Sequence, residues 1–253
     1  MKLLVAVSLV LGFGLLLAPR STSAITYCTP DGNGHPNVGA LVAEFEPGVK
    51  DILCSGTLIS PTVFLTASHC TIYLESLGLT DVWVTFDPVF DADSGTFLHG
   101  TYHTHPAFGH DQADPKDVAV VVLDAPAAGI APASLPQAGQ FDQMAPKNGL
   151  RGQRFTAAGY GVQEPVIGGG PPYFPFDGVR RVSVSEFRAI NKNWLRLSQN
   201  AATGDSGTCF GDSGGPNFLG ASSVVAAVTV TGDAMCLDSN VVYRLDTPSA
   251  RDI

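Results

Sequence analysis

The sequence predicts an all-β protein of the antiparallel kind, and three observations support this fold class. Its apolar segments are short and rich in Val and Thr, which favours strands. Turn-forming Gly, Pro, Asn and Asp separate these segments, with 28 Gly and 18 Pro among the 253 residues. Sustained helical periodicity is scarce. Many short strands joined by turns fit this pattern best.

Three segments are predicted as strands. Residues 81–86 alternate in polarity, as in a half-buried strand, whereas residues 118–123 and 222–230 are continuous apolar runs, as in buried strands. Near the C-terminus, Thr247 is placed to cap a short helix and Pro248 to occupy its first position. Turn-like stretches cover residues 29–36, 87–96, 125–140, 167–178 and 204–207.

Residues 1–24 are predicted as a secretory signal peptide. Lys2 precedes an apolar run, and the run gives way to small residues ending at Ala24. An uncleaved membrane anchor is the alternative, although the run is short for a membrane span and the small-residue exit favours cleavage. No later apolar stretch approaches the length of a transmembrane helix. We therefore expect residues 25–253 to be soluble and secreted.

The composition of the remaining chain restricts its partners. With 45% hydrophobic and 15% charged residues, the sequence is too apolar to be disordered, and its length suits one compact, enzyme-sized body. Loss of Lys2 and Arg20 with the signal peptide leaves 12 basic against 23 acidic residues, a net charge of −11 rather than −9. Such a chain offers no electrostatic footprint for nucleic acid or an anionic membrane. We expect neither as a partner.

Export makes the cysteines disulfide candidates. Their odd number leaves one over, and none has the C-x-x-C spacing of a structural zinc site. The five are Cys28, Cys54, Cys70, Cys209 and Cys236.

The most informative segment is residues 209–216, Cys-Phe-Gly-Asp-Ser-Gly-Gly-Pro, in which glycines flank Ser213 and Asp212 precedes it. Glycines permit backbone conformations in which N–H groups converge on a developing oxyanion. Taken alone, a glycine-rich turn with a serine is usually only a turn. Upstream, however, His69 lies in Leu-Thr-Ala-Ser-His-Cys and Asp117 opens an apolar run. A serine nucleophile needs a neighbouring imidazole base, and that base needs an orienting carboxylate.

These three motifs, in this order and at these separations, resemble the trypsin/chymotrypsin family of serine endopeptidases. Residues 54–59 resemble the strand before the family's catalytic histidine, and residues 158–161 resemble its G-W-G segment. The resemblance implies two packed, antiparallel six-stranded β-barrels, at about residues 25–135 and 136–253, followed by a short C-terminal helix. It also implies peptide-bond hydrolysis through an acyl-enzyme, with no cofactor.

The resemblance assigns roles to individual residues. His69, Asp117 and Ser213 become the catalytic triad, and the N–H groups of Gly211 and Ser213 become the oxyanion hole. It implies disulfides from Cys54 to Cys70 and from Cys209 to Cys236, and it leaves Cys28 over. Its partners would be polypeptide substrates and protein protease inhibitors, and we expect a monomer.

The specificity pocket can be predicted only coarsely. The position that holds trypsin's charge-pairing acid is Gly207, so no preference for Lys or Arg is expected. Asp205 lies nearby, where it is interpreted as a solvated turn acid. The resemblance places Thr229, Thr231 and Val241 on the pocket walls, where branched side chains would favour small or medium apolar residues before the scissile bond.

Activation in the family pairs a newly freed N-terminal ammonium with the acid before the nucleophile. Here Ile25 directly follows the predicted signal cleavage site, and Asp212 is that acid. Signal cleavage would then activate the protein directly, although residues 26–28 depart from the usual glycine pair. Some other internal partner for Asp212 is the alternative, since a buried charge needs one.

Other functions are alternatives to proteolysis. A catalytically silent binding protein on the same fold is one alternative. A metal-dependent hydrolase is another, because a histidine-rich stretch follows residue 98, although its spacing matches no ligand motif and a polar loop is favoured. Calcium binding by three loop carboxylates is a weaker suggestion. The stretch comprises His99, His103, His105, His110, Asp111 and Asp114, and the carboxylates are Asp87, Asp91 and Asp93.

Overall fold

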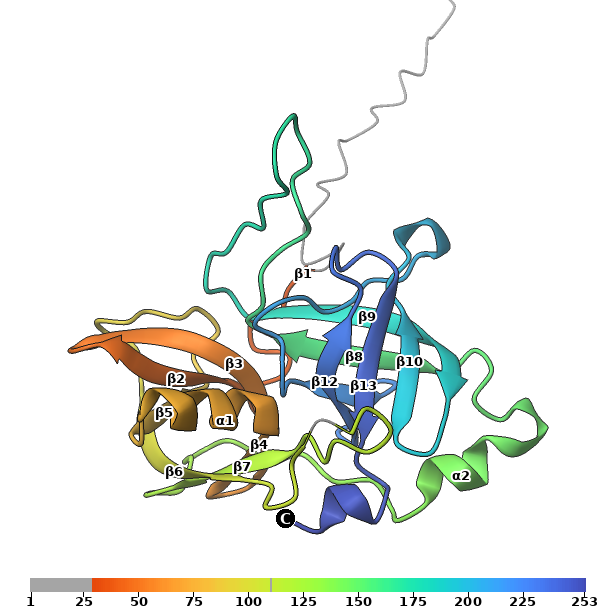
Figure 1. Cartoon of the computed structure of the whole chain (residues 1–253), viewed down its shortest axis with the longest axis horizontal. Helices are drawn as coiled ribbons and strands as arrows, with labels where there is room; N and C mark the ends of the chain where they lie inside the picture. Colours follow the sequence, from red (N-terminus) through yellow and green to blue (C-terminus); the bar gives the residue numbers. More distant parts are fainter. Residues whose placement is uncertain (1–28, 110) are drawn as a thin grey trace, which may run out of the picture.

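The computed structural model describes residues 29–109 and 111–253, which form two β-barrels side by side (Figure 1). The predicted signal peptide, Ile25, Cys28 and His110 lie outside the described residues. Within the described ranges, no helix is both long and apolar enough to cross a bilayer.

The first barrel is a closed ring of six antiparallel strands in the order β2-β3-β4-β7-β6-β5. Strand β5 is the alternating segment predicted at residues 81–86, and β7 is the apolar run predicted at 118–123; both predictions are confirmed. In chain order the strands are β2 (Val38–Glu46), β3 (Val49–Ser60), β4 (Val63–Thr66), β5 (Val82–Thr85), β6 (Leu98–Thr104) and β7 (Ala119–Leu123).

The second barrel contains the remaining strands in the order β9-β10-β13-β12-β11-β8, and pairing of β8 with β9 closes it. The short strand β1 (Thr29–Pro30) pairs with the first two residues of β9, Arg181 and Val182. The two six-stranded barrels confirm the predicted fold class. The strands are β8 (Arg154–Gly159), β9 (Arg181–Ile190), β10 (Trp194–Ser198), β11 (Pro216–Leu219), β12 (Val225–Gly232) and β13 (Ser239–Arg244).

Helices are few and short. Helix α1 (Ser68–Leu77) lies against the first barrel in Figure 1, and α2 (Gln140–Met144) lies between the barrels in sequence. The C-terminal helix is a single 3₁₀ turn, Ser249–Arg251, and its N-cap is Pro248, one residue later than the predicted Thr247. The Thr247 hydroxyl nevertheless accepts a hydrogen bond from the Ala250 N–H. Two further 3₁₀ turns cover Pro146–Asn148 and Ala201–Thr203.

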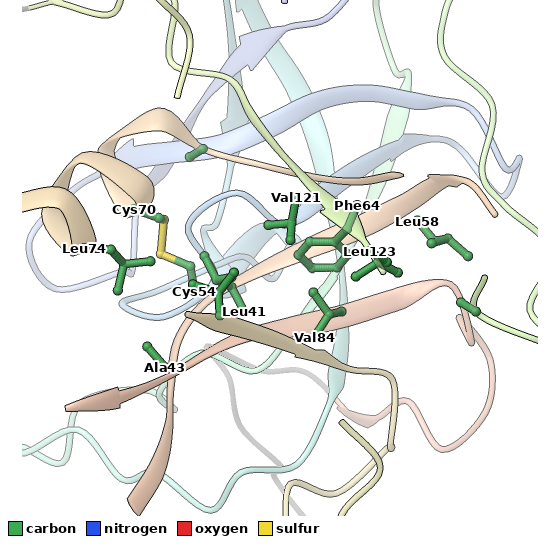
Figure 2. Close-up of a cluster of buried hydrophobic side chains, with 13 residues drawn as sticks. Leu41, Ala43, Cys54, Leu58, Phe64, Cys70, Leu74, Val84, Val121 and Leu123 are labelled. Carbon is green, nitrogen blue, oxygen red and sulfur yellow. A yellow bond between two sulfur atoms is a disulfide. The ribbon is translucent and has the colours of Figure 1, made fainter. Parts of the chain in front are cut away.

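Each barrel buries its own apolar core. The first core surrounds Phe64, and the predicted Cys54–Cys70 disulfide joins β3 to α1 at its edge (Figure 2). The second core surrounds Phe155 and Leu195. The Cys209–Cys236 disulfide, also predicted, lies in the second barrel.

A third core cluster forms the contact between the barrels. Val38 and Leu65 from the first barrel pack with Phe218 and Tyr243 from the second. Arg180, completely buried, reinforces this contact: its guanidinium donates to the Asp31 carboxylate at 3.0 Å and to the carbonyls of Val38 and Phe86 at 2.9 Å. Because the candidate site lies between the barrels, these contacts hold its two halves together.

Candidate active site

Strand pairing places His69 and Asp117 next to each other. Thr66 at the end of β4 is paired with Ala119 at the start of β7, so the residues just beyond these strand ends are neighbours. His69 follows β4 as the second residue of α1, and Asp117 precedes β7. The Asp117 carboxylate accepts the backbone N–H of His69 at 2.9 Å and lies 2.8 Å from ring atom Nδ1. With Asp117 only 3% exposed and His69 half-buried, the imidazole is held in one orientation.

A glycine-rich loop from the second barrel carries Ser213 to the same place. The Ser213 carbonyl accepts the N–H of Ser55 on β3 at 2.9 Å, and the N–H of Gly214 donates to Thr229 on β12 at 2.8 Å. Gly214 has φ +76°, and a Cβ there would overlap Thr66 and Ala67. Only glycine therefore lets the loop approach the segment that leads into His69.

The backbone around Ser213 presents two free donors. Gly211 has φ +94°, a conformation that residues with a Cβ rarely adopt. Among residues 29–109 and 111–253, neither the Gly211 N–H nor the Ser213 N–H has a hydrogen-bond acceptor. Within those ranges the Ser213 hydroxyl makes no hydrogen bond with the His69 ring, whose side-chain partner there is Asp117.

Asp212 points away from this surface. Its carboxylate is 2% exposed and accepts the N–H groups of Gly161 at 2.8 Å and Cys209 at 2.9 Å. No cation pairs with it within the described part of the chain. Burial raises the pKa of Asp212 to about 6, although its two backbone hydrogen bonds partly offset this effect. The Asp212 carboxylate is therefore available to pair with a cation that lies outside those residues.

A cavity of about 140 Å³ opens beside Ser213. Of the four residues predicted around it, Thr229 and Thr231 line the cavity, whereas Gly207 and Val241 do not. Val241 is paired with Thr231 across the β12–β13 ladder and packs toward the contact between the barrels. The predicted disulfide joins the two walls, and the full lining is Thr208, Cys209, Phe210, Ser213, Thr229, Val230, Thr231, Gly232, Asp233, Ala234 and Cys236.

A second cavity, of about 240 Å³, adjoins the first. Val230 and Thr231 line both cavities, so the two form one continuous surface across His69 and Ser213. Phe108 and Trp194 contribute aromatic side chains to the second cavity. An extended peptide could therefore place one side chain in the first cavity and an apolar one in the second.

Two acids lie near the first cavity, and each has its own partners in the fold. Asp205 is buried and paired with Arg154 at 3.0 Å, so its interpretation as a solvated turn acid was wrong. Burial opposes ionisation of the lining residue Asp233, but four backbone N–H donors outweigh that effect and lower its pKa. The Asp233 carboxylate is thus engaged by its own turn, residues 233–239.

The histidine-rich stretch does not converge on a metal site within the described residues. His99 lies between Asp124 and Asp81, with one ring nitrogen toward each, and its hydrogen bonds to the carboxylates of Asp124 and, to a lesser extent, Asp81 raise its pKa. Asp114 accepts the hydroxyl of Tyr243 at 2.6 Å. In these ranges only Cys54, His69 and Cys70 form a group of three potential ligands, and both of those sulfurs are in a disulfide.

Two of the three loop carboxylates considered for calcium accept backbone N–H groups. Asp87 accepts the N–H of Thr96 at 2.6 Å, and Asp91 accepts the N–H groups of Asp93 and Ser94. They stabilise turns of the loop between β5 and β6.

Several cavity residues were not predicted from the sequence. Thr208 and Phe210 flank Cys209 in the serine motif, so their proximity to Ser213 in sequence was an available signal. Gly232 ends β12, and Asp233 and Ala234 follow it. Only the β12–β13 register reveals which residues of this strand reach the cavity.

Comparison with known proteins agrees with this architecture. Residues 33–250 match the protein-family model described as Trypsin. A solved structure of HL collagenase superposes with a TM-score of 0.62 at 18% sequence identity, covering 87% of this chain and 92% of the collagenase. No curated protein matches the chain in sequence. The match to the family model spans most of the chain, and a disulfide-bonded domain of this kind is typical of secreted proteins. The chain belongs to the trypsin family.

Proposed function

We propose that this protein is a secreted serine endopeptidase with Ser213 as its nucleophile. One arrangement carries the proposal: an oriented histidine–aspartate pair lies on the first barrel, beside a serine loop on the second barrel with two N–H groups that have no acceptor in the described part of the chain. The cavity beside Ser213 provides a place for the side chain that precedes the scissile bond. Polypeptides are therefore the proposed substrates, and protein protease inhibitors are the proposed regulators.

The chemistry follows from the atoms available. His69 Nε2 removes the proton from the Ser213 hydroxyl as the oxygen attacks the scissile carbonyl carbon. Asp117 fixes the tautomer with the proton on Nδ1 and stabilises the imidazolium that forms. The Gly211 and Ser213 N–H groups donate to the carbonyl oxygen as it becomes negative. The imidazolium then protonates the leaving amine, and water releases the acyl group by the reverse sequence of proton transfers.

Activation is proposed to come from the N-terminus of the mature chain. The buried Asp212 carboxyl has no cation partner in residues 29–109 and 111–253, and an ammonium at Ile25 would supply one. A buried ion pair of this kind would stabilise the loop that holds Gly211 and Ser213. N-terminal sequencing of the active secreted protein tests this step: a start at Ile25 is expected, and a start elsewhere contradicts it.

The proposed preference is for small or medium apolar residues before the scissile bond. A cavity of about 150 Å³ accommodates a single benzene ring, so the 140 Å³ beside Ser213 suits a side chain of that size or smaller. Both oxygens of the lining carboxylate Asp233 already accept N–H groups of its own turn, so this acid is not placed to pair with a Lys or Arg side chain. We expect a soluble monomer without nucleic-acid or membrane partners.

Peptide turnover by the wild type and by Ser213→Ala tests the proposal. Wild-type turnover should be abolished by phenylmethylsulfonyl fluoride and unaffected by a chelator, whereas Ser213→Ala should be folded and inactive. Chelator-sensitive turnover would instead support a metal-dependent hydrolase. Peptide binding with no turnover by a wild type that starts at Ile25 would identify a catalytically silent binding protein.

A further inference from the structure

A buried side-chain amide that the proposed mechanism does not use lies behind the cavity beside Ser213. Gln199 follows β10, is 1% exposed, and its backbone N–H donates to the carbonyl of Asp238 at 2.8 Å. Its side-chain Oε1 accepts the backbone N–H of Thr208, a residue that lines the cavity. The Gln199 carboxamide is therefore attached to the wall of the cavity from behind.

The same carboxamide fills the space next to Gly207. A Cβ added at Gly207 would overlap Oε1, Cδ and Cγ of Gln199. Any side chain at position 207 would have to displace this buried carboxamide. Gln199 resists displacement because both its backbone N–H and its side-chain amide are hydrogen-bonded. Gly207 and Gln199 thus form a complementary pair, in which the glutamine occupies the volume that a residue-207 side chain would otherwise use.

Gln199 also separates the cavity from a groove on the outer face of the barrel. Its sequence neighbours Ser198 and Asn200 line that groove together with Arg188 and Arg196. The Arg188 guanidinium donates to the Ser198 hydroxyl at 2.9 Å. The group behind this wall of the cavity is therefore a neutral amide, which offers no charge partner to a cationic substrate side chain.

We propose that Gln199 is a specificity-determining residue, which closes the base of the cavity and prevents position 207 from carrying an acid. This inference rests on the proposed endopeptidase activity. Cleavage after short, uncharged side chains then results from the Gln199–Gly207 pair, whereas Gly207 alone would not account for it.

The test compares wild type with Gly207→Asp, Gln199→Gly and the double variant on peptides that differ only in the residue before the scissile bond: Ala, Val, Leu, Phe or Lys. Titration of the active site with a fluorophosphonate corrects each kcat/KM for the folded fraction. Gln199→Gly should raise the Phe-to-Val ratio by about tenfold or more, the scale of one or two methylenes in a pocket. Gly207→Asp alone should gain no Lys cleavage, and the double variant should gain it by about tenfold or more.

Two results would overturn the inference: an unchanged Phe-to-Val ratio in active Gln199→Gly, or equal gains of Lys cleavage in Gly207→Asp and the double variant. If the glycine variants do not fold, Gln199→Glu tests the same point, because it preserves shape and places a charge at the cavity base. Its Lys-to-Val ratio should rise by about tenfold, and an unchanged ratio contradicts the inference. A wild type that neither cleaves any peptide nor reacts with the fluorophosphonate would instead refute the endopeptidase activity itself.

Discussion

Replacement of Asp212 by Asn should remove a pH dependence of stability that this one carboxyl creates. The folded-state pKa of about 6 exceeds the ordinary value of 3.8 for an aspartic acid, so the folded protein binds this proton more tightly than the unfolded chain. The associated stability is fully present below pH 3.8 and is lost as the pH rises through 6. The two values differ by about two units, which corresponds to about 3 kcal/mol.

The magnitude applies to a chain in which no ammonium reaches Asp212, so the assay uses a form that retains Ala24 ahead of Ile25. Urea unfolding is measured from pH 3.5 to 7.5 in a Ser213→Ala background, which prevents self-digestion. The stability of Asp212→Asn relative to its parent should rise by about 3 kcal/mol across this range. Taking the difference between the two proteins cancels the other titrating groups.

A chain that begins at Ile25 provides the matched control. If its ammonium pairs with the carboxylate, ionisation is favoured, and Asp212→Asn should destabilise the protein at pH 7.5 by leaving the cation buried and unpaired. Two results would refute the reasoning: a parent-to-variant difference that does not change with pH in the extended form, or the same change in both forms.

Three further perturbations follow from the site and its supports. Asp117→Asn should lower kcat by about 10⁴-fold with little loss of stability, because the His69 ring would take the wrong tautomer. Steady-state kinetics and thermal unfolding measure the two effects, and a fall in kcat of less than tenfold would contradict the role assigned to Asp117. Arg180→Met should destabilise the protein by about 3–5 kcal/mol in urea, since Asp31 loses its buried cation, and a change below 1 kcal/mol would show that the contact between the barrels does not depend on it. Replacing Cys209 and Cys236 by Ser should destabilise the protein by about 3–4 kcal/mol, because the disulfide links residues 27 apart. It should also lower kcat/KM more than Arg180→Met does, although the two changes cost similar stability, because this disulfide joins the cavity walls.

Sequence alone was sufficient for the parts of the fold and site that depend on local pattern or motif. The alternating segment at residues 81–86 and the apolar run at 118–123 are strands β5 and β7, because side-chain periodicity reports the burial of each face. The serine, histidine and aspartate motifs indicated the family, and with it both disulfides. The short C-terminal turn was readable from Thr247 and Pro248.

Features that depend on contacts between distant segments could not be predicted. Asp205 looked like a solvated turn acid, but Arg154, 51 positions earlier on β8, pairs with it in the folded protein. Gly207 was correctly seen to lack an acid, yet its contact with Gln199 exists only because β10 ends behind the cavity wall. The buried contacts of Arg180 likewise join segments about 100 residues or more apart. Such pairings arise from tertiary packing, which residue patterns do not encode locally.

Trapping of the acyl-enzyme is the most direct test of the central claim that Ser213 is a peptidase nucleophile. The protein beginning at Ile25 is mixed with a chromogenic ester of an apolar amino acid, quenched in acid during the burst, and mapped by mass spectrometry. A stoichiometric burst with the acyl group on the peptide containing Ser213, absent in Ser213→Ala, is the predicted result. An acyl group on another residue, or peptide turnover that persists in Ser213→Ala, would contradict the claim.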